Sequence, residues 1–212
     1  MRTLVIDTAT EACSIALFDE DEPIASDHRV LGRGHAEHLV PMIAGLPEKG
    51  RADRIAVARG PGSFTGVRVG IAAARALSFA WNVPCLGYST PALVAAMALH
   101  EGKRAPVAVV MNGGHGEYFV QNFAAEGTAQ DEVRSLPPEQ AAQAARHRVI
   151  AGNRAQAVAD LLDGEVLALE LLPDANYACL LDDAYLSPDL TPIYGRGPDA
   201  KVPMPRVRGR DL

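Results

Sequence analysis

The chain has 212 residues, of which 48% are hydrophobic and 22% are charged, and its formal net charge at pH 7 is −6. At this length it can form one large domain or two smaller ones, with a core that requires neither a metal nor a disulfide. The negative charge argues against a protein whose whole surface binds nucleic acid. Its three cysteines include no Cys-x-x-Cys pair, which fits a reducing compartment. We therefore expect a cytoplasmic protein without a secretory leader or a membrane span.

Hydrophobic periodicity and turn residues divide the chain into alternating strands and helices. In the first half we expect strands at 3–7, 13–19 and 23–30, a helix at 35–46, a strand at 54–59, a helix at 64–80, a strand at 84–88, and a helix from 89 or 90. In the second half we expect strands at 106–112, 117–123 and 132–136, a helix at 138–146, a strand at 147–151, a helix at 154–162, a strand at 166–171, and a helix at 174–186. Each half reads βββαβαβα, which predicts a duplicated α/β architecture with a cleft between the halves.

This pattern predicts an N-terminal domain at 1–102, a second domain at 103–190, and a tail at 191–212. The tail is rich in Pro, Gly and Arg, so we expect it to be extended and either packed on the body or flexible. Its basic residues offer a direct contact to RNA, or are simply solvated; they are Arg196, Lys201, Arg206, Arg208 and Arg210.

The glycine-rich stretch "RGPGSFTGVRVG" resembles a phosphate-binding loop in outline. However, Val67 and Arg68 follow Gly66, where a P-loop needs Lys and then Ser or Thr. The glycine spacing also differs from the Gly-x-Gly-x-x-Gly of dinucleotide-binding folds. The stretch therefore lacks the residues of both phosphate-binding motifs.

The helix that follows this stretch allows two interpretations. It is either buried inside its own domain, or it places one side on the sheet and its small-residue side against a helix of a partner. The small-residue side consists of Gly66, Gly70, Ala73, Ala74 and Leu77. A second apolar flank consists of Val69, Ala72, Ala76 and Phe79. Apolar residues on both flanks allow the helix to be covered on both sides.

The preceding helix, "HAEHLVPMIAGL", begins with His35 and His38 and has Leu39 and Met42 on its apolar face. Two histidines three residues apart can hold a metal, but no third ligand follows at helical spacing. The pattern therefore favours solvated or interface histidines over a metal site.

The first hairpin, "IDTATEACS", supplies the candidate contacts to a nucleotide, Asp7, Thr8 and Thr10. Glu11 adds a negative charge where phosphates would lie, and the matching hairpin of the second half has Asn112 in place of an acid. Phosphoryl transfer needs acidic metal ligands and a base, and only Asp7 is available. An alternative function as a small kinase or ATPase with the same fold therefore depends on Asp7.

The chain resembles the TsaB (YeaZ) family in "LVIDTATEACSIAL", "GHAEHLVPMI", "GPGSFTGVRVGIAAARAL" and "PCLGYSTPALVA". The resemblance implies a two-domain actin-like, Hsp70-like fold of the ASKHA (RNase H-like) class. It also implies a non-catalytic role in making threonylcarbamoyladenosine next to the anticodon of tRNAs that read codons beginning with A. An older alternative for this family is a protease that cleaves its partner. The residues give that alternative little support, because Ser63 lies outside a Gly-x-Ser-x-Gly elbow.

The implied partners are the catalytic paralogue TsaD, the ATPase TsaE and a second copy in a homodimer, with tRNA bound only through the complex. The resemblance implies that the chain has no cofactor of its own, although ATP or ADP can bind at the boundary with TsaD and TsaE. The implied docking surface is a helix bundle that uses His35, His38, Leu39, Met42, Gly66, Arg68, Val69, Gly70, Ala73, Ala74 and Leu77. We therefore expect Gly70→Leu or Ala74→Arg to abolish docking without unfolding the chain.

Two segments depart from the family pattern. The second hairpin has Asn112-Gly113-Gly114 where the family has Asp-Ala-Arg, and the tail has Tyr194-Gly195-Arg196 where the family has Tyr-Leu-Arg. The first departure weakens the case for nucleotide turnover, and the second leaves the position of the tail open.

Overall fold

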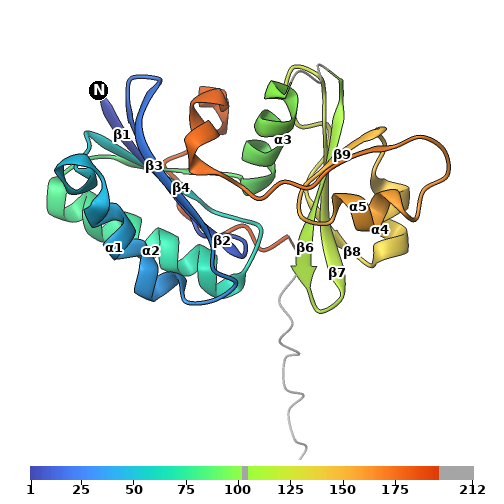
Figure 1. Cartoon of the computed structure of the whole chain (residues 1–212), viewed down its shortest axis with the longest axis horizontal. Helices are drawn as coiled ribbons and strands as arrows, with labels where there is room; N and C mark the ends of the chain where they lie inside the picture. Colours follow the sequence, from blue (N-terminus) through green and yellow to red (C-terminus); the bar gives the residue numbers. More distant parts are fainter. Residues whose placement is uncertain (102–104, 196–212) are drawn as a thin grey trace, which may run out of the picture.

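The computed structural model describes residues 1–101 and 105–195. Within these residues the chain forms two lobes side by side, each built on a five-stranded sheet (Figure 1). The elements of the first lobe are β1 (Arg2–Asp7), β2 (Ala12–Asp19), β3 (Glu22–Val30), α1 (His35–Gly45), η1 (Pro47–Gly50), β4 (Arg54–Ala58), α2 (Phe64–Trp81), β5 (Cys85–Tyr88) and α3 (Thr90–His100). Those that follow are β6 (Val107–Gly114), β7 (Glu117–Phe123), β8 (Arg134–Leu136), α4 (Pro138–Ala144), β9 (Val149–Ala151), α5 (Ala155–Ala159), β10 (Leu167–Leu169), η2 (Ala175–Leu180) and η3 (Asp183–Tyr185).

The two sheets have the same topology, which confirms the predicted duplication. In the first lobe the strand order is β3-β2-β1-β4-β5, and in the second it is β8-β7-β6-β9-β10. In each sheet the first three strands pair antiparallel, and the two remaining strands run parallel to the first, β4 and β9 next to it and β5 and β10 at the edge. The parallel pairs need crossover helices, which α1 and α2 supply in the first lobe and α4 and α5 in the second.

The central strand β1 is apolar, and its residues from Thr3 to Asp7 are all buried. α1 and α2 lie side by side on one face of this sheet (Figure 1). α2 begins where the Ser63 hydroxyl accepts a hydrogen bond from the Gly66 N–H, and it ends at Asn82, which has a positive φ. None of the helices in the described part of the chain is both long enough and apolar enough to span a bilayer.

Two segments pack across the expected boundary at residue 102. α3 packs on β6 and β9 of the second sheet, while its Leu93 and Met97 belong to the core of the first lobe. In return, η2 packs against β1, β2 and β3 of the first sheet. The predicted domain limits stay a prediction, but the lobes share elements at their boundary.

The prediction of one helix at 174–186 is wrong, because the structure has two short 3-10 helices there, η2 and η3. The carboxylate of Asp174 accepts a hydrogen bond from the Asn176 N–H at 2.9 Å, and that of Asp182 accepts from the Ala184 N–H at 2.8 Å. Each aspartate therefore starts a separate turn, because its carboxylate accepts a hydrogen bond from the backbone N–H two residues later, an N–H that a continuous helix would bond to a backbone carbonyl. The helix expected at 154–162 is also shorter than predicted and spans Ala155–Ala159.

The end of the described chain returns to the first lobe. The Ile193 N–H donates to the Arg59 carbonyl at 2.8 Å, and the Arg59 guanidinium donates to Asp189 at 3.1 Å. Residues 191–195 therefore pack on the body. The basic residues expected to offer an RNA contact lie outside the described residues, namely Arg196, Lys201, Arg206, Arg208 and Arg210.

Candidate functional site: the α1/α2 face and the cleft between the lobes

The glycine-rich stretch packs against the turn between β1 and β2. The Thr8 hydroxyl donates to the Gly66 carbonyl at 2.7 Å, and the Ser63 N–H donates to the Ala9 carbonyl at 2.6 Å. A Cβ on Gly66 would collide with the Thr8 carbonyl oxygen, and a Cβ on Gly70 would collide with the Thr8 hydroxyl. The glycines therefore allow the helix to approach a turn of its own lobe closely.

This packing corrects the expectation that the glycines form a surface for a partner. Gly66, Gly70 and Ala74 are buried in their own lobe, as are Leu39 and Met42 on α1. The physical reason is that these residues face the sheet and the β1–β2 turn, which already cover them. Gly70→Leu and Ala74→Arg would consequently disrupt the lobe itself, contrary to the prediction.

The remaining residues of the predicted docking surface have mixed exposure. Val69, Ala73 and Leu77 are half-buried at the edge of α2, and Arg68 is exposed. These four residues therefore remain candidates for a contact with a partner.

The two histidines of α1 are engaged with the backbone. His35 is buried, and its Nε2 lies 3.1 Å from the Ala12 carbonyl oxygen. His38 is exposed, and its Nδ1 lies 2.9 Å from the Gly34 carbonyl oxygen. Burial corrects the expectation for His35 as a docking residue, because its ring fixes the start of α1 to β2. In the part of the chain that the structure describes, no three His, Cys, Asp or Glu residues are grouped to hold a metal.

α1 and α2 each carry exposed apolar residues on their outer sides, next to exposed charged residues such as Arg75. Phe79 is 90% exposed and Val40 is 61% exposed, values that are high for large apolar side chains. We call the exposed apolar set the α1/α2 face; it consists of Ala36, Val40, Ala44, Ala72, Ala76 and Phe79. On each helix these residues are three or four positions apart and therefore lie on one side. The helical pattern predicts Ala72, Ala76 and Phe79 on a second flank of α2. It gives no prediction for Val40, although the spacing of residues 36, 40 and 44 is a usable signal.

The first residues of α2 also hold the end of the described chain. The Arg68 guanidinium lies over the Phe64 ring, 3.3 Å from its centroid, and donates to the Tyr194 hydroxyl at 2.6 Å. The Phe64 and Tyr194 rings are 5.8 Å apart. This cation–π arrangement attaches residues 193–195 to the start of α2.

Asp7, the candidate metal ligand, is fully buried. Its carboxylate accepts hydrogen bonds from the Ala9 N–H at 2.9 Å and from the Tyr88 hydroxyl at 3.2 Å. Burial raises the pKa of Asp7 to about 7, although these two hydrogen bonds act in the opposite direction. Asp7 therefore points into the protein and is partly protonated near neutral pH, unlike a carboxylate that would ligate magnesium from the cleft.

The two threonines are also engaged close to the backbone. Thr8 is buried and bonded to α2, while the Thr10 hydroxyl accepts from the Ala12 N–H at 3.2 Å. Thr10 lines a cavity of about 330 Å³ between the lobes, together with Glu11, Asn112 and Asn153. The structure brings Thr10, but neither Asp7 nor Thr8, to this cavity.

A hydrogen-bonded bridge crosses the cleft where phosphates were expected. The Asn153 amide donates to both carboxylate oxygens of Glu11 at 2.9 Å, and its own oxygen accepts from the Asn112 N–H at 2.9 Å. Asn153 belongs to the "AGNRA" turn, which the sequence suggested as a place for an adenosine or as a helix cap. In the structure its side chain links the second lobe to the first.

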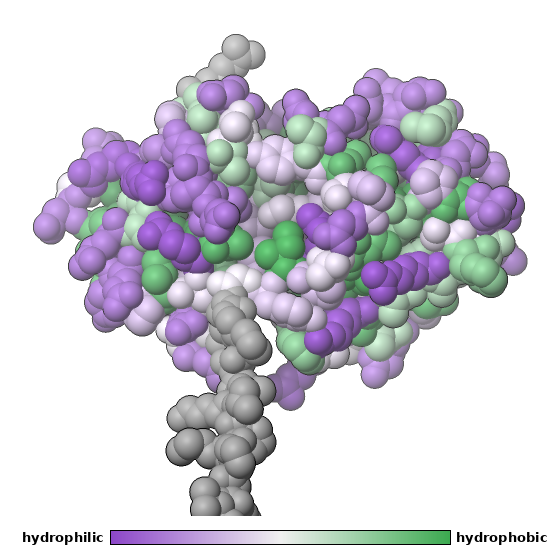
Figure 2. Space-filling model, turned by 180° about the vertical axis from the view of Figure 1, so that it is seen from behind, coloured by the Kyte–Doolittle hydropathy of each residue, from purple (hydrophilic) through white to green (hydrophobic). Residues whose placement is uncertain are grey.

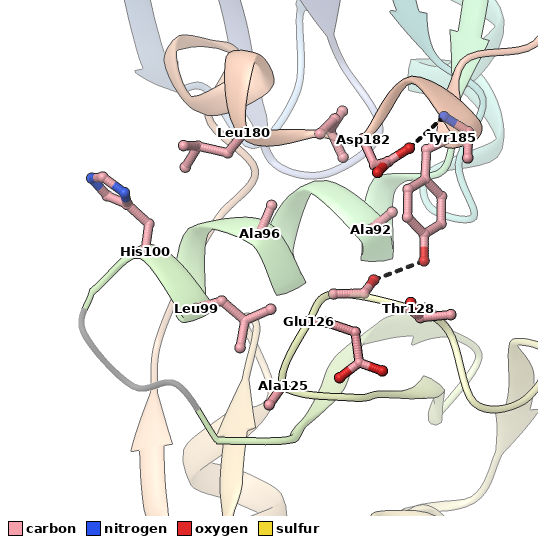
Figure 3. A pocket seen from close by; sticks show the side chains of 13 residues that line it. Ala92, Ala96, Leu99, His100, Ala125, Glu126, Thr128, Leu180, Asp182 and Tyr185 are labelled. Atoms are coloured by element: carbon pink, nitrogen blue, oxygen red, sulfur yellow. Dashed lines mark hydrogen bonds between the residues drawn. The ribbon is translucent and has the colours of Figure 1, made fainter.

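A larger groove of about 780 Å³ lies beside α3 (Figure 3). Its floor is apolar and contains Ala92, Ala96 and Leu99, and the acids Glu126 and Asp182 lie at its sides. The Tyr185 hydroxyl closes one end by donating to the Gly127 carbonyl at 2.8 Å. The groove therefore combines an apolar floor with polar side chains at its rim, which also include His100 and Thr128. Elsewhere, hydrophobic and hydrophilic residues are interspersed on the surface seen from behind (Figure 2).

Comparisons with known proteins relate the chain to a family. A family model described as "TsaD: tRNA N6-adenosine threonylcarbamoyltransferase" matches residues 28–168. The tRNA threonylcarbamoyladenosine biosynthesis protein TsaB of Escherichia coli (strain K12) is 36% identical over 124 residues, which are 56% of this chain and 53% of that protein. TsaB of Bacillus subtilis (strain 168) is 33% identical over 115 residues, which are 50% and 49% of the two chains. The chain thus spans about half the length of the curated relatives that it matches.

Solved structures support the same relationship over more of the chain. YeaZ from Pseudomonas aeruginosa is 31% identical, with a TM-score of 0.73, over 85% of this chain and 89% of the other. A second structure, described as similar to peptidase YEAZ from Pseudomonas aeruginosa, is 33% identical with a TM-score of 0.71, over 84% and 89%.

Proposed function

This chain belongs to the TsaB (YeaZ) branch of the TsaD family, and we propose that it is the non-catalytic subunit of a complex that makes threonylcarbamoyladenosine in tRNA. In this proposal the paralogue TsaD carries out the transfer next to the anticodon of tRNAs that read codons beginning with A. TsaE joins the assembly, ATP or ADP binds at the boundary with these partners, and tRNA is bound only through the complex.

The observation that carries the proposal is the α1/α2 face. Two neighbouring helices present six apolar residues to solvent, including an almost fully exposed Phe79. Such a surface is typical of a protein–protein interface. The small side chains of Ala72 and Ala76 let a facing helix approach closely, and Phe79 supplies an aromatic anchor of the kind that dominates binding energy.

The size of the face fits a specific interface. α1 has 11 residues and α2 has 18, so they are about 16 Å and 27 Å long at 1.5 Å per residue. Two helices of these lengths can bury about 800 Å² on each side, the size of a standard protein–protein interface. We propose the paired helices of the TsaD paralogue as the occupant. A second copy of this chain would use the same face and therefore competes with TsaD.

The environment of Asp7 supports a non-catalytic role over the alternative of a kinase or ATPase. Both of its oxygens are bonded inside the lobe, and Glu11 adds a bonded carboxylate to the cleft. If the chain hydrolysed ATP by itself, ADP production would be measurable and would be lost on Asp7→Ala. We expect no such production.

The docking proposal is tested with Ala72→Arg. Ala72 is exposed, so the variant should keep the fold while its charge and bulk block the approach of a helix. We expect it to lose co-elution with TsaD of the same organism on size exclusion, and to lose formation of the modified nucleoside on tRNA in the full assay. Gln143→Arg, on the exposed side of α4 in the other lobe, is the matched control. Co-elution of Ala72→Arg at the wild-type level would refute the proposal.

A further inference from the structure

The turn between β1 and β2 joins the α1/α2 face to the second lobe. On one side, the Glu11 carboxylate accepts two hydrogen bonds from the Asn153 amide across the cleft. On the other side, the Glu11 carbonyl accepts from the N–H groups of Leu31 and Gly32 at 2.9 and 3.0 Å. Residues 31–32 lead directly into α1. Glu11 is therefore bonded both to the second lobe and to the segment that begins α1.

The same turn also holds the start of α2. The Ala9 carbonyl accepts from the Ser63 N–H, and the Thr8 hydroxyl donates to the Gly66 carbonyl. Both helices of the α1/α2 face thus begin on the five residues from Thr8 to Ala12. A displacement of this turn relative to the sheet would move the first turns of both helices.

The second lobe presents Asn153 from a rigid position. Gly152 has a φ of +118°, and a Cβ there would collide with the Val110 carbonyl oxygen. The turn is thus packed directly on β6. The Asn112 N–H donates to the Asn153 oxygen, which turns the amide nitrogen toward Glu11. A rigidly held donor on the second lobe, opposite an acceptor on the β1–β2 turn, can fix the position of that turn relative to the second lobe.

We propose that Glu11 and Asn153 are positioning residues, whose bond across the cleft fixes the β1–β2 turn to the second lobe and thereby sets the start of α1 and α2 for docking. The link to docking rests on the proposed function, whereas the bridge between the lobes does not.

The test uses an exchange of the two groups. Asn153→Asp sets a second carboxylate against Glu11, so the two hydrogen bonds are lost and repulsion replaces them. The double variant Glu11→Gln with Asn153→Asp restores a donor opposite an acceptor, because the introduced amide can donate to the introduced carboxylate. Glu11→Ala removes the bridge without adding repulsion. It replaces Asn153→Asp as the test variant if Asn153→Asp fails to fold.

The first measurement is amide hydrogen exchange of the isolated chain. For Asn153→Asp and Glu11→Ala we expect at least ten-fold faster exchange at Leu31 and Gly32, whose N–H groups donate to the Glu11 carbonyl, and a return toward wild type in the double variant. Unchanged exchange in both single variants, or no recovery in the double variant, would overturn the bridge.

The second measurement is the Kd for TsaD. We expect Asn153→Asp to weaken binding at least ten-fold and the double variant to recover it. If exchange rises while the Kd stays constant, the bridge exists but its role in docking is wrong. If the wild-type chain does not bind TsaD, the proposed function fails, while the exchange result still decides whether the bridge joins the lobes.

Discussion

At the scale of single residues, the environment of Asp7 separates this cleft from that of a phosphoryl-transfer enzyme. Its side chain is fully buried, next to the buried hydroxyl of Tyr88. The pKa of Asp7 rises to about 7, mainly because burial disfavours the charged form. A carboxylate that is costly to ionise in the folded state makes stability depend on pH.

The pH dependence has a definite sign. Between pH 4 and 7 the folded chain keeps a proton on Asp7 that the unfolded chain has released, so the free energy of unfolding falls as pH rises through this window. We expect wild type to lose about 3 kcal/mol more between pH 5 and pH 8 than Asp7→Asn, which cannot ionise. Urea unfolding of both proteins at the two pH values measures this difference. Parallel losses in the two proteins would contradict the assignment of the effect to Asp7.

At the scale of elements, α2 carries small residues on two opposite sides. One side contains Gly66, Gly70 and Ala74 and packs on its own lobe, while Ala72 and Ala76 on the other side face solvent. The buried glycines allow contact with the Thr8 turn. In the proposed complex the exposed alanines would leave room for a helix of the partner, the role that the sequence pattern predicts for the glycines.

Two Gly→Ala substitutions test the buried role of Gly70. We expect Gly70→Ala to destabilise the chain by about 1–3 kcal/mol, because the added methyl group would overlap the Thr8 hydroxyl. This loss should exceed the gain of about 1 kcal/mol that alanine brings to a helix. The matched control is Gly45→Ala in α1, where a Cβ would have no neighbour within 4 Å, so stability should stay equal or rise. Thermal unfolding compares the variants, and an unchanged Tm in Gly70→Ala would contradict this packing.

At the scale of the whole molecule, the two lobes are duplicated in topology but not independent. α3 supplies apolar residues to both cores, and η2 covers the sheet of the first lobe after the chain has passed through the second. Ser14 of β2 donates to Asp174 at 3.1 Å and accepts from the Ala175 N–H at 2.8 Å. The first lobe is therefore completed only when residues far along the chain return to it.

This exchange predicts how fragments behave. A fragment of residues 1–102 would expose the side of α3 that packs on β6, as well as the strands that η2 covers. We expect it to lack cooperative thermal unfolding and to bind a hydrophobic dye, because buried apolar area is the main favourable contribution to folding. A chain of residues 1–195 contains both η2 and the second lobe that cover these surfaces and should unfold cooperatively. A cooperative transition in the short fragment would show that the lobe is self-sufficient.

The sequence by itself determined the order and type of most elements and the duplicated topology. Hydrophobic periodicity and turn or cap residues, such as Ser63 before α2, act on neighbouring residues. They can therefore be read from the sequence without knowing how the rest of the chain packs. The final helix was mispredicted because Asp174 and Asp182 form local caps that an average pattern does not resolve.

Only the tertiary structure decided which side of α2 is exposed. Both sides are apolar and small, so the periodic pattern fits either orientation, and the contact with Thr8 comes from a residue 58 positions earlier than Gly66. The burial of Asp7 and the bond between Glu11 and Asn153 likewise join residues that are distant in the chain. The local sequence pattern specifies each helix or strand. Which of its residues are buried, which acids are protonated and which side faces solvent are decided only when distant segments pack against it.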